Sequence, residues 1–145
     1  MIKKIKLLLT IFVLINIQNL SYGIENFYKE GLKKYDDKKY EDSKFLFQRN
    51  IVFNPQDIKS YLYLAKIYKI EENKKEEEKN VNTVLLLDPN NEEAIYMLME
   101  IELIKSNYSK VEELLKSFSK ICKNLCKEEK LILDKLKNLE PKNES

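Results

Sequence analysis

Apolar residues follow a helical spacing along most of the chain. In residues 60–71 they fall at i, i+3, i+4 and i+7, which places them on one stripe of a helix. The clearest stripes are Tyr61, Leu64, Ala65 and Tyr68; Val81, Val84 and Leu85; Ile95, Leu98 and Met99; and Val111, Leu114, Leu115, Phe118 and Cys122. The pattern predicts helices of about 13 residues that are joined by short turns, and therefore an all-α fold.

Two proline-containing segments, FNPQDIKS and LDPNNEEA, interrupt this pattern 34 residues apart. Proline lacks a backbone N–H and clashes with the preceding turn, so Pro55 and Pro89 predict the ends of helices. Asp57 and Asn91 are predicted to cap the helices that follow. The recurrence indicates that a whole helix-turn-helix unit repeats.

The repeat resembles the tetratricopeptide repeat (TPR), a pair of antiparallel helices with this period. The matching positions are Phe27, Gly31, Tyr40, Ser43, Phe47 and Pro55 in the first repeat; Tyr61, Leu64, Ala65, Tyr68, Val81, Val84 and Pro89 in the second; and Ile95, Leu98, Met99, Tyr108, Leu115 and Phe118 in the third. Gly31 and Ala65 are small where the paired helices are expected to approach closely. The resemblance implies a TPR-type α-solenoid of about three repeats plus a C-terminal capping helix.

The resemblance also sets the expected domain boundaries. These are a signal peptide at 1–23, TPR repeats at 24–57 and 58–91, a TPR-like repeat at 92–125, a capping helix at 126–140 and a disordered tail at 141–145. A stack of repeats exposes an apolar end, which the apolar face of Ile132, Leu136 and Leu139 is expected to cover.

The charged run at residues 71–79 departs from the TPR pattern. Lys74 and Glu77 replace an aromatic and a small residue at the start of the second helix of repeat two. We expect a solvated helix start that buries little, with lysine stems covering some apolar surface. A docking role for the charged run is the alternative.

The first 23 residues are interpreted as a secretory signal. Three lysines precede an apolar run at residues 7–17, and Ser21 to Gly23 form a small-x-small cleavage signal. The apolar run would span about 16 Å as a helix, well short of the ~30 Å hydrocarbon core of a membrane. The protein is therefore expected to be periplasmic. An uncleaved segment that anchors it to the inner membrane is the alternative.

Composition excludes several classes of function. The chain has no histidine, which removes the commonest general base and metal ligand. Loss of the signal would leave 23 basic and 24 acidic residues, and Arg49 is the only arginine, so no nucleic-acid partner is expected. Gly31 is the only glycine after the signal, which rules out a glycine-rich phosphate loop. We predict no catalytic, cofactor or metal site, and no enzymatic activity.

Cys122 and Cys126 are the only cysteines, and in an exported chain they predict a structural disulfide. Asn124 is expected to end the last repeat helix, so that the bridge pins this helix to the capping helix. So short a loop contributes only ~2 kcal/mol in the chain-entropy model. Free thiols and thiol-exchange chemistry are the alternatives, although the spacing is not that of a CxxC motif.

The resemblance further implies a concave groove that is lined by the first helix of each repeat. Its predicted lining is Tyr28, Leu32, Tyr35, Leu62, Lys66, Lys69, Tyr96, Glu100 and Leu103. The positions of the carboxylate clamp of some TPR proteins hold Tyr28, Leu32, Tyr63, Glu93 and Met97, so that clamp is absent.

An aromatic and aliphatic groove suits an extended peptide or an amphipathic helix of another protein. Lys66 and Lys69 are expected to steer an acidic partner. We therefore predict an exported interaction module or scaffold. The alternatives are a membrane-tethered scaffold, an assembly or chaperone factor for envelope complexes such as outer-membrane assembly or cytochrome maturation, and a thiol-redox enzyme. The oligomeric state is left open.

Overall fold

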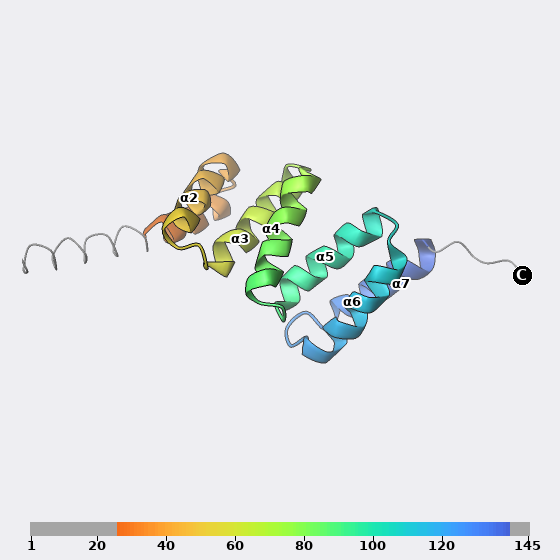
Figure 1. Cartoon of the computed structure of the whole chain (residues 1–145). Helices are drawn as coiled ribbons and strands as arrows, with labels where there is room; N and C mark the ends of the chain where they lie inside the picture. Colours follow the sequence, from red (N-terminus) through yellow and green to blue (C-terminus); the bar gives the residue numbers. More distant parts are fainter. Residues whose placement is uncertain (1–25, 140–145) are drawn as a thin grey trace, which may run out of the picture. The chain divides into compact units, whose positions relative to one another are not determined.

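The computed structural model describes residues 26–139, which form seven helices without a strand (Figure 1). The first runs over residues 26–36, and the others are α2 (Tyr40–Phe53), α3 (Ile58–Ile70), α4 (Lys74–Leu87), α5 (Glu92–Ile104), α6 (Tyr108–Ile121) and α7 (Glu128–Leu139). The predicted all-α fold is confirmed. The predicted signal at 1–23 and tail at 141–145 lie outside the described residues.

The chain divides into two compact units, Met1–Ser60 and Tyr61–Ser145, and each is described by itself. In the first unit the helix over residues 26–36 packs closely on α2. A β-carbon on Gly31 would lie 2.9 Å from Cε1 of Phe47, whose side chain is fully buried. Ser43 Oγ donates a hydrogen bond of 2.8 Å to the Gly31 carbonyl oxygen. The close approach that was predicted at Gly31 is confirmed.

The core of the second unit joins α5, α6 and α7, which lie side by side in Figure 1. Its buried members are Ile95, Met99, Leu103, Val111, Leu115, Phe118, Ile132 and Leu136. Ile132 and Leu136 therefore cover the end of the repeat stack, as predicted for a capping helix. Leu139, which was expected on the same face, is 50% exposed because it stands at the last residue of α7.

One type of turn recurs at a 34-residue interval. Lys38, Glu72 and Ser106 all have a positive φ, of 59°, 58° and 59°. At Glu72 the backbone N–H donates to the carbonyl oxygen of Lys69 at 3.2 Å, and the N–H of the next residue, Asn73, donates to Tyr68 at 2.9 Å. This pair of bonds is a Schellman motif, which ends a helix with one left-handed residue. The position usually favours glycine, and none of the three residues is glycine.

The other type of turn contains the two prolines, and each lies outside the helices as predicted. Asn91 caps α5, because its Oδ1 accepts a hydrogen bond of 3.1 Å from the backbone N–H of Ala94. Asp57 behaves differently. Its Oδ2 accepts hydrogen bonds of 2.6 Å from the Ser60 hydroxyl and from Asn50 Nδ2, which ties the end of α2 to the start of α3.

The expectation that α4 begins with a solvated, weakly packed turn is wrong at Glu77. Asn73 Oδ1 accepts a hydrogen bond of 3.3 Å from the Glu76 N–H and fixes the helix start, and Glu77 is only 2% exposed. Its carboxylate lies 3.4 Å from Lys74 Nζ. Glu77 stands one repeat after Ser43 and one repeat before Val111, which are both fully buried. The helix geometry therefore turns this position inward, whatever side chain it carries.

Candidate functional site

The predicted lining residues of the first unit lie on the helix over residues 26–36 and are all half-buried. The ring centroid of Tyr28 lies 5.8 Å from that of Phe47, and the ring of Tyr35 lies 5.6 Å from that of Tyr40. Both tyrosines thus pack on aromatic residues of α2. Leu32 lies between them in the sequence and is half-buried as well.

In the second unit, a pocket of about 320 Å³ brings together predicted lining residues from two helices. We call it the Tyr96 pocket; it is lined by Lys66 and Lys69 of α3, Glu93, Tyr96 and Met97 of α5, and Leu125 and Glu128 near the start of α7. The predicted lining did not include the contribution of α7 and the segment before it. Leu125 and Glu128 thus add to the pocket wall.

The remaining predicted residues of this unit lie elsewhere. Glu100 and Leu103 line a neighbouring pocket of about 350 Å³, which also includes Lys135 and Leu139 of α7. Leu103 is only 6% exposed and belongs mainly to the core. Leu62 lines a larger pocket of about 670 Å³ near the start of α5, which we call the loop pocket. Leu125 lines both the loop pocket and the Tyr96 pocket.

Ion pairs between helices balance the charges on this face. Lys66 Nζ lies 2.7 Å from Glu93 Oε1, so one pair joins α3 to α5. Glu100 of α5 forms ion pairs with Lys69 of α3 and with Lys135 of α7. The distance from Lys135 Nζ to Glu100 Oε1 is 3.2 Å. Both lysines that were predicted to attract an acidic partner are therefore already paired with glutamates.

Tyr96 and Glu100 form a short polar chain beside these pairs. The Tyr96 hydroxyl donates a hydrogen bond of 3.3 Å to Glu100 Oε1. Burial raises the pKa of Tyr96 to about 12, and the negative charges of Glu100 and Glu128 add to this effect. Burial also raises the pKa of Glu100, but hydrogen bonds and charges from Lys69 and Lys135 outweigh it and hold this pKa below its usual value. At neutral pH the site therefore presents a neutral phenol and a charged carboxylate.

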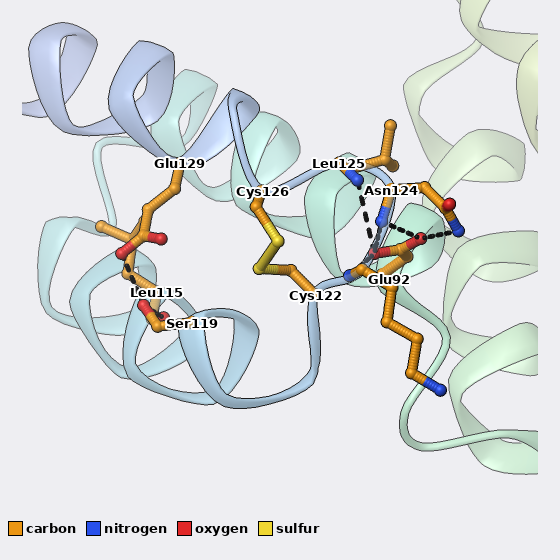
Figure 2. The surroundings of a disulfide bond; sticks show 9 residues. Glu92, Leu115, Ser119, Cys122, Asn124, Leu125, Cys126 and Glu129 are labelled. Carbon is orange, nitrogen blue, oxygen red and sulfur yellow. Dashed lines mark hydrogen bonds between the residues drawn. A yellow bond between two sulfur atoms is a disulfide. The ribbon is translucent and has the colours of Figure 1, made fainter.

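A disulfide joins Cys122 and Cys126 in the structure, with their Cα atoms 5.2 Å apart (Figure 2). Cys122 is the C-cap of α6 and donates its N–H to the Phe118 carbonyl oxygen at 2.9 Å. The expectation that Asn124 ends this helix is wrong. Helix α6 ends at Ile121, and Asn124 takes part in a different contact.

That contact is made with Glu92 at the first turn of α5, as Figure 2 shows. Glu92 Oε2 accepts hydrogen bonds from the backbone N–H groups of Lys123 at 2.7 Å, Asn124 at 3.2 Å and Leu125 at 3.5 Å. Asn124 Nδ2 donates to Oε1 at 2.9 Å.

Successive N–H groups that converge in this way form a nest for an anion. The hydrogen bond from the Lys123 N–H is the largest cause that lowers the pKa of Glu92, and the bonds from Asn124 and Leu125 lower it further. Burial raises this pKa, but the net effect is a pKa below the ordinary value. The sequence shows Glu92 only as an acidic residue in a first turn, which is common at any helix start. No local signal indicates its partner.

Two negative findings apply to the part of the chain that the structure describes. No group of three or more metal-ligating side chains comes together within residues 26–139. Over the same residues, no helix combines the length and apolar character that a membrane span requires.

The fold is similar to that of solved TPR domains and secretion chaperones. The TPR2B domain of yeast Sti1 in complex with pHsp70 has a TM-score of 0.71 and 16% identity, with 81% of this chain and 98% of that chain covered. PcrH in complex with the chaperone-binding region of PopD has a TM-score of 0.71 and 16% identity over 81% of this chain and 93% of that one. The Yersinia enterocolitica chaperone SycD, in complex with a peptide of the translocator YopD, has a TM-score of 0.67 and 19% identity over 79% and 90%.

No protein-family model matches the sequence, and a search of curated proteins finds no match either. The structural likeness nevertheless establishes an all-α, TPR-type fold.

Proposed function

We propose that this protein is an interaction module that binds a peptide or helical segment of another protein at the Tyr96 pocket. The observation that carries the proposal is the pocket itself, which α3, α5 and the segment before α7 build around a tyrosine in the second unit. Tyrosine combines a large apolar ring with a polar end and is a frequent anchor at interfaces. The similar structures of PcrH and SycD hold segments of other proteins, which supports the same use here.

The balanced charges indicate what kind of segment would fit. An acidic segment would have to displace Glu93 or Glu100 from the lysines that they already pair with. A largely uncharged segment with an aliphatic or aromatic side chain can bind without breaking these ion pairs. We propose such a segment as the partner at the Tyr96 pocket, and propose Tyr28, Leu32 and Tyr35 as anchors for a partner on the first unit by itself.

We further propose that the module works in the periplasm after removal of residues 1–23. The basic start and the apolar run of the sequence support this setting. Intact-mass measurement on protein that is purified from the cell envelope tests it. A mass that corresponds to a start at Ile24 is expected, and a mass that still includes Met1 would favour the membrane-tethered scaffold.

Site-specific photo-crosslinking tests the binding proposal. A photoreactive phenylalanine analogue in place of Tyr96 should crosslink a protein partner in cells, whereas the same analogue in place of Lys116, on the exposed surface of α6, should not. With the captured partner in hand, Tyr96→Ala should weaken binding by about 1–2 kcal/mol. Equal capture from both positions, or binding that is unaffected by Tyr96→Ala, would contradict the proposal.

A role as an assembly factor or chaperone is the second candidate, because SycD is described as a type III secretion translocator chaperone and PcrH is in complex with the chaperone-binding region of PopD. Co-expression distinguishes it from a passive scaffold. A chaperone is expected to raise the soluble amount of its captured partner, and Tyr96→Ala should abolish that increase.

A further inference from the structure

The segment between the two cysteines connects three parts of the second unit. Residues 123–125 offer three backbone N–H groups to Glu92 at the start of α5. Leu125 then lines the Tyr96 pocket, and α7 begins three residues later, at Glu128. The disulfide closes this segment into a loop of five residues. A change in the conformation of this loop would therefore alter both the hydrogen bonds of Glu92 and the position of Leu125 in the wall of the Tyr96 pocket.

We propose that the Cys122–Cys126 disulfide is a thiol-sensitive clasp for the Tyr96 pocket. In the oxidised protein it holds residues 123–125 around the Glu92 carboxylate and keeps Leu125 in the pocket wall. Reduction opens the loop, releases Glu92 and loosens that wall. The control of partner binding rests on the proposed function, but the clasp itself does not.

The exposure of the two cysteine residues favours a reversible bond over a buried structural disulfide. Cys126 is exposed and Cys122 is half-buried, so a reductant reaches Cys126 first. A thiolate of a dithiol reductant attacks the Cys126 sulfur and breaks the S–S bond, and Cys122 leaves as a thiolate that takes up a proton. The second thiol of the reductant then attacks the mixed disulfide. It frees Cys126, which is protonated in turn, and the reductant becomes a disulfide. Two electrons and two protons thus pass to the protein.

Other contacts between α6 and α7 do not depend on the disulfide. Phe118 and Ile132 are fully buried and hold α6 and α7 in the core without the disulfide. The Ser119 hydroxyl of α6 also donates a hydrogen bond to Glu129 of α7 (Figure 2). In the chain-entropy model, a disulfide across five residues favours the closed over the open form by about thirtyfold in the equilibrium constant. Reduction should therefore open the loop locally while both helices remain folded.

Hydrogen exchange on the full chain is the first test. The oxidised protein and the same protein treated with dithiothreitol are compared by NMR at each backbone amide. In the reduced protein, exchange at residues 123–125 should accelerate at least tenfold, while exchange at Phe118 in α6 stays nearly unchanged. The Leu125 methyl and Tyr96 ring signals should shift together. Unchanged protection of residues 123–125 after complete reduction would overturn the clasp.

The Glu92 carboxyl gives a second, independent readout. In the oxidised protein its pKa lies below the ordinary value of 4.5, and after reduction it should move back toward 4.5. Glu92→Gln should accelerate exchange at residues 123–125 with the disulfide intact, whereas Glu112→Gln on the exposed surface of α6 should not. If the pKa of Glu92 is the same in both redox states, residues 123–125 hold the Glu92 carboxylate without the disulfide, and the proposal is overturned.

The double variant Cys122→Ser/Cys126→Ser should reproduce the reduced state. If it fails to fold, reduction of the native chain still decides the question. The crosslinking experiment then separates the two proposals. Capture at position 96 that falls several-fold on reduction supports both, and equal capture with an unaltered loop overturns the clasp alone. An opened loop without any captured protein supports the clasp and overturns the proposed function.

Discussion

The ring of Phe47 occupies the space that a β-carbon on Gly31 would need, 2.9 Å from its Cε1 atom. Gly31→Ala should therefore force the two helices of the first unit apart and lower the free energy of unfolding by about 1–3 kcal/mol, the usual cost of overpacking. Urea unfolding measures this change.

The next repeat supplies the matched control. One period later the same two positions hold Ala65 and Val81, and both are fully buried. The double variant Gly31→Ala/Phe47→Val copies this pair, so it should recover part of the lost stability. A double variant that is less stable than both single variants would contradict the close-contact explanation.

Ser106 carries a positive φ in a turn where glycine would be unstrained. Ser106→Gly should raise the free energy of unfolding by about 0.5–1 kcal/mol, because the left-handed conformation costs L-residues more than glycine. Ser109→Gly, three residues later in α6, makes the same chemical change at a helical position. It should lower stability by roughly 0.5 kcal/mol. The same sign for both variants would rule out strain at Ser106.

Glu77 is a buried carboxylate whose ion-pair partner, Lys74, is half-exposed. Glu77→Val introduces the residue found one repeat later at Val111 and removes the need to bury a charge. Replacing a buried ionic group by an apolar one of similar volume is often neutral or stabilising by 1–4 kcal/mol, so we expect a gain of about 1 kcal/mol in thermal or urea unfolding. Glu76→Ala, one residue earlier, should change little. A large loss on Glu77→Val would show that the carboxylate is needed.

Tyr96 should make stability depend on alkaline pH. Burial, then the charges of Glu100 and Glu128, raise its folded pKa to about 12 from the ordinary value of 10. The unfolded protein therefore loses the phenolic proton first, and the stabilisation is complete below pH 10 and disappears as the pH rises toward 12. Tyr96→Phe loses a hydrogen bond that is worth about 0.5–1.5 kcal/mol at neutral pH. The gap in unfolding free energy between the wild type and this variant should shrink above pH 10, and a constant gap up to pH 12 would disprove the link.

Exchanging the charges of Lys66 and Glu93 should preserve the ion pair between these two positions. Lys66→Glu places two negative charges side by side and should lower stability by up to about 1 kcal/mol, less in high salt. Lys66→Glu/Glu93→Lys restores opposite charges and should return stability close to that of the wild type. Unfolding in low and in high salt measures both effects, with Lys116→Glu on α6 as the control. A double variant that is no more stable than the single one would mean that the pair is not formed in solution.

Local features of this fold could be predicted from the sequence, since they depend on neighbouring residues. Pro55, Pro89 and the cap at Asn91 mark helix ends through their own backbone chemistry, and the structure confirms them. Gly31 was recognised as a close-contact position because the repeat pattern fixes where paired helices meet.

Features that depend on distant residues could not be predicted in the same way. The partners of Glu92 lie 31 to 33 residues further along the chain, and nothing in its own surroundings indicates them. For Glu77 the sequence predicts the wrong burial, because the charged residues around it indicate a solvated helix whereas its register in the repeat decides its burial. The pairing of Lys66 and Lys69 with glutamates of α5 likewise needed the spatial arrangement of α3 and α5.

Contacts between nearby parts of the second unit also have a kinetic consequence. The bonds from residues 123–125 to Glu92, and from Lys135 to Glu100, close loops of only 31 to 35 residues. Rates of folding rise as the sequence separation of native contacts falls, because shorter loops lose less entropy on closure. The second unit can therefore fold as soon as its own helices have left the ribosome, without waiting for a distant part of the chain.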